Sequence, residues 1–261
     1  MAFATVVAGM FLVFSNVEVS RQRAEAAFHA ALESAEDLDQ ARALFGKSAG
    51  YHEELRQRGA HNADLNRNQG NAYLLAGDLP RAILAYRRGL RLAPADALLQ
   101  ANLTHAREQV ISSGPGKPGW PAEEIWTPGL PYLSPGLLLG LCCGAYTLGW
   151  LGLVRWWMVR RGAPLAWGVL AFSLALVLAA GLAFEEWSAR YESLHPLAVV
   201  VTDGTPLRKG NGVLYPTRLE TPLRRGVEAR LLLGRGDWLQ IELAGGATGW
   251  VPRAAVLLDT P

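Results

Sequence analysis

Two long apolar segments, residues 130–154 and 163–184, contain no charged residue. Each exceeds the roughly 20 apolar residues that an α-helix needs to cross the hydrocarbon core of a bilayer. Only residues 155–162 separate them, and this stretch carries Arg155, Arg160 and Arg161. The sequence therefore predicts an integral membrane protein with two transmembrane helices joined by a short basic loop.

The three arginines also predict an orientation. Short loops rich in Lys and Arg stay on the cytoplasmic side of a membrane. If residues 155–162 are cytoplasmic, the regions before and after the hairpin both lie on the other side, in the periplasm or the exterior. No ionisable residue falls inside either apolar segment, so an anchor is favoured over a transport path.

Small residues recur every four positions in both apolar segments, a spacing that lets membrane helices approach closely. We expect these residues to pack the two helices together. They are Gly136, Gly140 and Gly144 in the first segment, and Ala171, Ala175, Ala179 and Ala183 in the second.

Residues 1–20 begin with a third, shorter apolar run, AFATVVAGMFLVF. Its length is that of a signal-peptide core, but it lacks a basic start and a clear cleavage site. A cleaved signal, an uncleaved anchor and a start codon assigned too late all remain open.

Residues 21–112 carry the pattern of packed helical hairpins. In GNAYLLAGDLPRAILAYRRGLRLAP, small Gly70 is followed by Tyr73, a turn, Ala82, Tyr86 and finally Pro94. Small residues facing large ones indicate two closely crossing helices, and proline ends the second. This order resembles the tetratricopeptide repeat, a helical hairpin of about 34 residues. We expect two such repeats and a capping helix, ALLQANLTHAREQV.

Tetratricopeptide arrays bind extended peptides in a concave groove. The resemblance places five residues in that groove, and it implies that three of them, Arg67, Asn71 and Asn102, could hold a terminal carboxylate. The alternative is that these are residues common in the family with no ligand. The groove candidates are Arg67, Asn71, Leu74, Asn102 and His105.

Four arginines, Arg81, Arg87, Arg88 and Arg91, lie on the second helix of the hairpin. Two interpretations stay open for them, a solvated helix face, which we favour, and a docking surface.

After a linker rich in Pro and Gly, residues 113–129, and the hairpin, residues 195–261 predict a small barrel. Short segments such as DWLQIEL alternate apolar and polar residues, and glycine turns separate them. The order VVVT, PLRKGNG, LRRG, GRGDWLQIEL and GATGWV resembles the bacterial SH3 domain, with a longer stretch between Gly212 and Pro222. The resemblance implies a ligand surface formed by Tyr215, Trp238 and Trp250. For the two tryptophans, the alternative is a place in the core of the barrel.

Composition narrows the function. The net charge is +2, and acids and bases are balanced, which argues against a nucleic-acid partner. Both cysteines, Cys142 and Cys143, lie within an apolar segment, so neither a disulfide nor a metal site is expected. No nucleophile elbow, phosphate loop or metal-ligand spacing occurs. We expect a protein that is not an enzyme and has no cofactor.

The fold class is thus multi-domain, with all-α hairpins, a transmembrane hairpin and a small all-β barrel. This order resembles the BatE-like proteins of bacterial aerotolerance operons. The resemblance implies a non-catalytic scaffold in the bacterial inner membrane, with periplasmic soluble domains. Its implied partners are von Willebrand A domain proteins of the membrane and, indirectly, a MoxR-type ATPase. A cell-wall sensor or targeting protein that binds peptidoglycan through its SH3-like module is the alternative.

Overall fold

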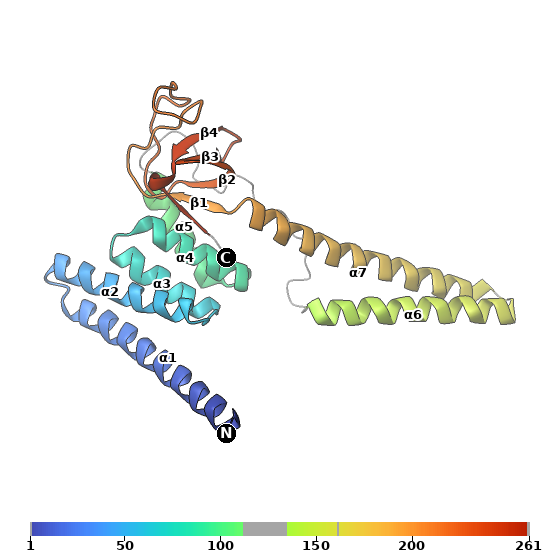
Figure 1. The fold of residues 1–261 in the computed structure, drawn as a ribbon. Coiled ribbons are helices and arrows are strands. Elements are labelled where there is room, and N and C mark those ends of the chain that lie inside the picture. The colour runs from blue at the N-terminus through green and yellow to red at the C-terminus, as the bar shows by residue number, and fades with distance from the viewer. Residues whose placement is uncertain (1, 112–134, 161, 260–261) are drawn as a thin grey trace. The chain divides into compact units, whose positions relative to one another are not determined.

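The computed structural model describes residues 2–111, 135–160 and 162–259 (Figure 1). The chain divides into two compact units, each described here by itself. One unit comprises Met1–Ala122 and Pro196–Pro261, and the other is Glu123–His195. The first unit therefore combines segments from both sides of the apolar hairpin.

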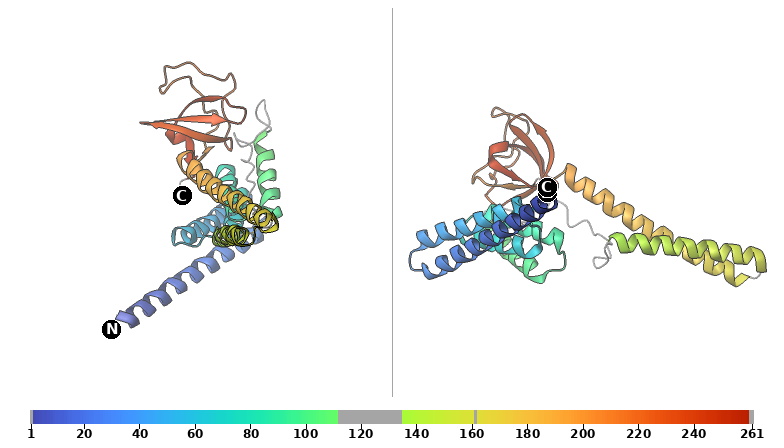
Figure 2. Two further views of the ribbon diagram at one scale, coloured as in Figure 1. Left: turned by 90° about the vertical axis from the view of Figure 1, so that its right-hand side faces the viewer. Right: turned by 60° about the horizontal axis from the view of Figure 1, so that its bottom comes forward.

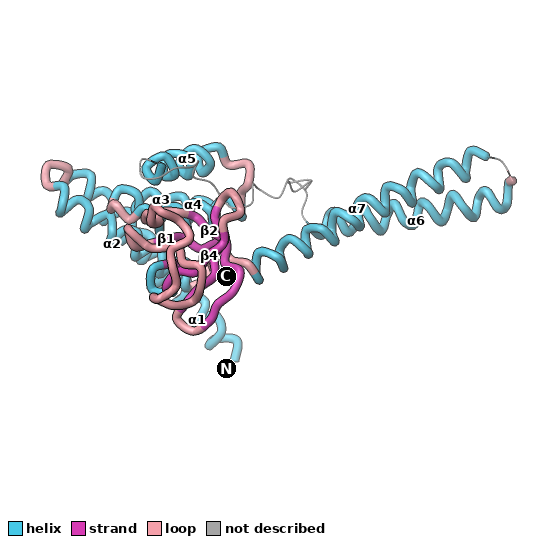
Figure 3. Tube along the Cα trace, turned by 90° about the horizontal axis from the view of Figure 1, so that it is seen from above, coloured by secondary structure: helices cyan, strands magenta, loops and turns pink. Residues whose placement is uncertain are grey.

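Five helices form the N-terminal part of the first unit and pack in succession (Figure 3). They are α1 (Ala2–Glu33), α2 (Leu38–Gln57), α3 (Ala63–Leu75), α4 (Leu79–Leu92) and α5 (Ala97–Ile111). The starts of three helices follow local signals, because the side chains of Asp37, Asn62 and Asp78 accept hydrogen bonds from exposed N–H groups of the first turn. Helix α1 continues through residue 20, so the boundary predicted there is not a break in secondary structure.

Close packing of α3 against α4 explains the order of small and large residues. A Cβ atom added at Gly70 would lie 2.4 Å from Cε1 of Tyr86. The Tyr86 ring is fully buried, and its hydroxyl donates a hydrogen bond to Oδ1 of Asn71 at 2.8 Å. One helix later, a Cβ atom at Gly89 would lie 2.8 Å from Leu99 of α5. Each glycine therefore makes room for a large side chain of the neighbouring helix.

A buried polar contact joins α2 to α3. Gln69 is 1% exposed, and its Nε2 donates to Oε2 of Glu53 at 2.8 Å. Arg56 donates to the other oxygen of Glu53 at 2.6 Å. Burial alone would raise the pKa of Glu53, but the hydrogen bonds from Arg56 and Gln69 outweigh it and lower this pKa to about 2. Gln69 thus joins α3 to α2.

Five antiparallel strands complete the first unit, in the order β4-β3-β2-β1-β5. The strands are β1 (Leu197–Val200), β2 (Glu228–Arg235), β3 (Trp238–Leu243), β4 (Thr248–Pro252) and β5 (Val256–Leu258), with a 3₁₀ turn η1 (Arg253–Ala255) before the last. Alternate residues of β3, namely Leu239, Ile241 and Leu243, enter the core of the sheet, as the sequence pattern predicts.

Strand β1 is covered on both faces (Figures 1 and 2). Ala198 and Val200 lie in the core of the β module, whereas Leu197 and Val199 join the core formed by α4 and α5. At the adjoining turn, Gly226 has φ +88, and a Cβ atom there would lie 2.7 Å from Val110 of α5. The core of the helices and the core of the β module therefore meet at β1, and the two parts form one compact unit.

The second unit is an apolar helical hairpin of α6 (Pro135–Val159) and α7 (Gly162–Leu194). By length and composition, Gly136–Val159 and Gly162–Ser188 are suited to cross a membrane. The loop predicted at residues 155–162 is wrong in extent, because α6 continues to Val159 and only two residues separate the helices. The bend occurs at Arg160, whose φ is 56. The predicted linker, residues 113–129, and residues 130–134 lie outside the described residues.

The packing role predicted for Gly136, Gly140 and Gly144 is wrong for this hairpin. A Cβ atom at Gly136, Gly140 or Gly144 would meet nothing within 4 Å. The face of α6 toward α7 instead contains Leu138, two positions along the chain and so about 200° around the helix from Gly136. The residues that allow close approach are Gly149, Gly152 and Gly168, and a Cβ atom at Gly152 would lie 2.8 Å from Cα of Gly168.

The four alanines of α7 divide between two faces. Ala175 is buried, its carbonyl accepts a hydrogen bond from the Cys142 thiol at 3.4 Å, and Ala171 is half-buried. Ala179 and Ala183 are exposed, so their predicted role in packing α6 against α7 is wrong. A period of exactly four residues drifts around a helix of 3.6 residues per turn, which is why only part of such a stripe faces one partner.

Candidate interaction sites

Two of the predicted groove residues, Asn71 on α3 and Asn102 on α5, are in direct contact. Asn102 donates from Nδ2 to Oδ1 of Asn71 at 2.9 Å, and this same oxygen accepts from Tyr86. Arg67, one turn before Asn71, pairs with Asp64 at 2.6 Å and with Asp96 at 3.3 Å. Asn71 and Asn102 therefore bind each other, and Arg67 is already bound by neighbouring carboxylates. A ligand carboxylate would have to compete with Asp64 and Asp96 for Arg67.

The remaining two groove candidates differ in exposure. Leu74 is half-buried and packs against the core shared with β1. His105 is exposed on α5, with its ring 3.3 Å from the Gln109 amide and 3.9 Å from Glu108. Of the five candidates, His105 is the one whose side chain is most accessible to a partner.

Trp238 and Trp250 lie on the outer face of the sheet. Trp238 belongs to β3, and Trp250 pairs with Gln240, two residues further along β3, so the two indoles share a face on neighbouring strands. Both are half-exposed, and neither belongs to the buried cluster of the β module. The alternative of a core position is therefore wrong for both tryptophans.

Tyr215 comes from a loop that is joined to β4. The backbone of Arg208 exchanges two hydrogen bonds with Trp250, at 2.9 and 2.8 Å, and the Arg208 guanidinium donates to the carbonyl of Tyr215 at 2.7 Å. Hydrogen bonds of Arg208 thus link the loop that carries Tyr215 to Trp250 of β4.

Buried ion pairs connect α4 and α5 to the β module, an arrangement that the sequence analysis did not predict. Glu228 at the start of β2 has a side chain only 3% exposed. It accepts two hydrogen bonds from Arg107, at 2.5 and 2.9 Å, and lies 3.7 Å from Arg87. This bidentate geometry is the strongest form of an arginine–carboxylate contact.

Asp259 makes the second of these contacts, directly after β5. Its side chain is 1% exposed, and it accepts a hydrogen bond from Nε of Arg88 at 2.7 Å, while Arg91 lies 2.5 Å from its other oxygen. The preferred interpretation of a solvated face is therefore wrong for Arg87 and Arg88, whereas the Arg91 side chain stays 45% exposed while it pairs with Asp259. They form a docking surface, and the docked partner is the C-terminal module of the same chain. We call these contacts with Glu228 and Asp259 the arginine junction.

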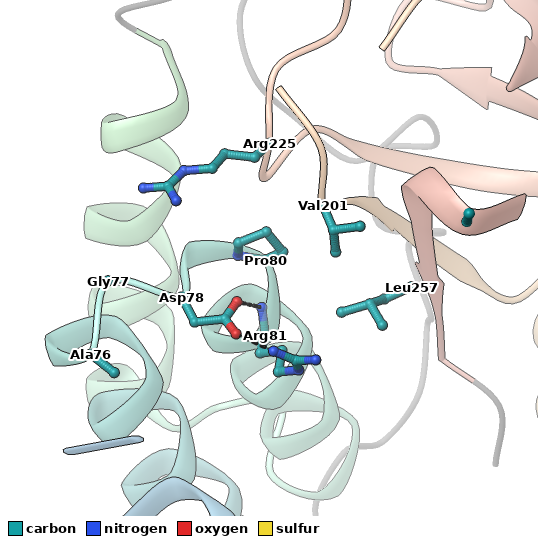
Figure 4. A pocket seen from close by; sticks show the side chains of 9 residues that line it. Ala76, Gly77, Asp78, Pro80, Arg81, Val201, Arg225 and Leu257 are labelled. Atoms are coloured by element: carbon teal, nitrogen blue, oxygen red, sulfur yellow. Dashed lines mark hydrogen bonds and ion pairs between the residues drawn. The ribbon is translucent and has the colours of Figure 1, made fainter. Parts of the chain in front are cut away.

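The fourth arginine of α4 lines a pocket at the edge of this interface (Figure 4). Arg81 pairs with Asp78 in the first turn, and Arg225 reaches the same pocket from the β module, where it lies 3.9 Å from Asp203. The pocket has a volume of about 530 Å³ and is completed by Ala76, Gly77, Pro80, Val201, Ala254 and Leu257. Both of its arginines are engaged by carboxylates of the chain.

One feature of the sequence points to the arginine junction, namely an acidic residue at the start of a buried strand. Glu228 opens the strand segment EARLLLGR, where burial would leave its charge without water. A buried carboxylate in a strand needs a cation as its partner, and the arginines of α4 can supply one.

Within residues 2–111, 135–160 and 162–259, no group of three His, Cys, Asp or Glu side chains could hold a metal ion.

No protein family matches the chain, and no curated protein matches it.

Proposed function

We propose that this protein is a non-catalytic scaffold, anchored in the bacterial inner membrane by α6 and α7, that binds protein partners through its helical hairpins and its SH3-like module. The observation that carries the proposal is the arginine junction. Buried ion pairs and the packing of β1 against α4 and α5 fix the helical hairpins to the β module. Partners bound to the two modules would therefore be held at a fixed separation.

The helical hairpins support the tetratricopeptide part of this proposal. Gly70 and Tyr86 interlock as in such repeats, and α5 covers the last hairpin. The β module supports the SH3-like part through its five short antiparallel strands and outward tryptophans. We further propose a BatE-like role, in which partners are von Willebrand A domain proteins of the membrane and, through them, a MoxR-type ATPase.

The arginine junction also bears on topology. Residues that precede α6 pack against residues that follow α7, so both must lie on one side of any membrane that the hairpin crosses. An even number of crossings between them meets this requirement. With Arg160 and Arg161 between the two helices and Arg155 near the end of α6, we propose that both modules lie in the periplasm.

Site-specific photo-crosslinking in bacterial membranes tests the scaffold. A crosslinker in place of exposed His105 should capture a partner, whereas one in place of Lys47, exposed on α2, serves as the matched control. Mass spectrometry should identify a von Willebrand A domain protein at position 105. Absence of any product specific to position 105 would remove the helical groove from the proposal.

Cell-wall binding is a second candidate, favoured by the two half-exposed tryptophans on one face of the sheet. The flat faces of aromatic side chains can stack on sugar and peptide ligands. If this function applies, the full chain in detergent should sediment with peptidoglycan, and the Trp238→Ala/Trp250→Ala variant should not. Equal sedimentation of the parent and the variant would contradict it, provided that far-ultraviolet circular dichroism shows the same secondary structure in both.

A further inference from the structure

The loop of residues 207–218 carries an exposed apolar tip. Val213 is 70% exposed, Leu214 96% and Tyr215 50%. At 96% exposure, Leu214 has essentially no neighbour in the described part of the chain. A contiguous group of exposed apolar and aromatic side chains often marks a surface that binds a membrane or a protein.

This loop is held in a defined shape rather than exposed by chance. Lys209 N–H donates to the carbonyl of Pro216 at 3.0 Å, and Arg218 N–H donates to that of Leu207 at 2.7 Å. A Cβ atom at Gly210 would lie 2.5 Å from the Tyr215 ring, so the ring rests directly on the backbone of the opposite arm.

At the root of the loop, Leu207 is buried in the core of the β module. The tip is therefore preorganised, and insertion of Leu214 into a bilayer would require little additional ordering of the loop backbone.

The charged residues within the loop have one sign, and the nearest acidic residues, Asp203 and Glu220, flank it. Residues 205–219 contain Arg208, Lys209 and Arg218 and no Asp or Glu. Lys209 and Arg218 are exposed. Segments that insert into the surface of an anionic bilayer combine apolar side chains, an aromatic residue at the interface and flanking basic residues. This loop has the same composition.

Chain length limits how far the β module can lie from such a surface. The candidate span of α7 ends at Ser188, and β1 begins at Leu197. The six helical residues 189–194 and two extended residues between them extend about 16 Å. A module of this size has a radius of gyration of about 11 Å, so its surface stays within a few tens of ångströms of the bilayer in which α7 would be anchored.

We propose that the tip Val213, Leu214 and Tyr215 inserts into the surface of the bilayer that holds the hairpin, with Lys209 and Arg218 contacting anionic lipid headgroups. The β module is then held against the membrane at a second point besides its covalent link to α7. This inference uses the proposed membrane anchoring but is independent of the partner bound by the helices.

An environment-sensitive fluorophore tests this in the full chain. Cys142 and Cys143 are replaced by Ala, a single cysteine is placed at Leu214 and labelled with NBD, and the protein is reconstituted in nanodiscs of phosphatidylcholine with or without phosphatidylglycerol. The matched control carries the label at Ala244, in an exposed turn of the same module. Incorporation into nanodiscs is measured first, and its failure would argue against the membrane anchor itself.

We expect a blue-shifted emission at position 214 in anionic nanodiscs and quenching by nitroxide-labelled lipids at least about twofold stronger than at position 244. Lys209→Gln with Arg218→Gln should reduce the shift in anionic discs to that in neutral ones. Water-like emission at position 214 in both compositions, or equal quenching at the two positions, would overturn the proposal and leave the tip as a surface for a protein.

Discussion

The arginine junction and the contact between α6 and α7 both fix a helix against a neighbour, but they use opposite chemistry. In the arginine junction, α4 and α5 offer Arg88 and Arg107 to carboxylates that are almost completely buried. Between α6 and α7, glycine backbones touch, with Gly152 against Gly168, and a cluster of rings from Tyr146, Trp150 and Phe172 lies alongside.

The difference follows from the surroundings of each contact. In water, apolar burial drives association, and paired charges then add geometric specificity at the edge of the core. In a bilayer, lipid is as apolar as leucine, so close backbone packing has to supply the attraction. The comparison fits the proposal that α6 and α7 lie in a bilayer and that the first unit lies in water.

The largest expected effect comes from removing one carboxylate of the arginine junction. Glu228→Gln leaves Arg107 without its bidentate partner in a mostly buried position, and should cost about 2–4 kcal/mol of unfolding free energy in the first unit. Thermal unfolding of the full chain in detergent micelles, followed by circular dichroism, measures this.

Exposed Glu220→Gln is the control for that variant and should leave the transition unchanged. Equal transitions for the two variants would mean that Glu228 is solvated and that the arginine junction does not hold the modules together.

The α6–α7 contact should respond to size instead of charge. Gly152→Ala places a methyl group against backbone atoms of Gly168 and Pro164, which cannot rotate away, and should cost about 1–3 kcal/mol. Gly140→Ala, where nothing lies within 4 Å, is the matched control. Distances between spin labels on α6 and α7 should increase only for the first variant, and an increase for neither would contradict the described packing.

A smaller effect is expected within the helical hairpins. Gly70→Ala displaces the Tyr86 ring, which costs about 1–3 kcal/mol, but alanine recovers up to about 1 kcal/mol in helix propensity. We expect a net loss near 1 kcal/mol. Gly46→Ala on α2 meets nothing within 4 Å and should instead stabilise. Stabilisation by both substitutions would show that α3 and α4 do not cross at Gly70.

The last expected effect depends on pH. The pKa of Glu53 falls from 4.5 to about 2 in the folded chain, so its contribution to stability is complete above pH 4.5 and is lost as pH falls from 4.5 through 2. The difference in unfolding free energy between the parent and Glu53→Gln should therefore narrow over this range. A difference that stays constant from pH 5 to pH 2 would contradict the contact with Arg56 and Gln69.

The sequence was a good guide wherever a local pattern determined the structure. Charge-free length predicted two apolar helices, alternation predicted β3, and the small-to-large order around Gly70 predicted a close helix crossing. These features depend on residues near one another in the chain, so periodicity and turn chemistry suffice to find them.

Contacts between distant residues were not predictable in this way. Arg88 and Asp259 are 171 positions apart, and no pattern in either segment names the other. The stripe of Gly136, Gly140 and Gly144 had the right composition for packing but lies on the face of α6 away from α7. Composition identifies what a helix face can do, whereas its partner is determined by the three-dimensional arrangement.

The most direct test of the account is whether the helices and the β module are energetically coupled through the arginine junction. A double-mutant cycle with Arg107→Gln and Glu228→Gln, measured by chemical unfolding of the full chain in micelles, isolates that coupling. The structure predicts a coupling energy of about 1.5 kcal/mol or more, because Arg107 binds both oxygens of a buried carboxylate. Additivity of the two substitutions within about 0.5 kcal/mol would contradict the account, since it would mean that the two modules do not form one body.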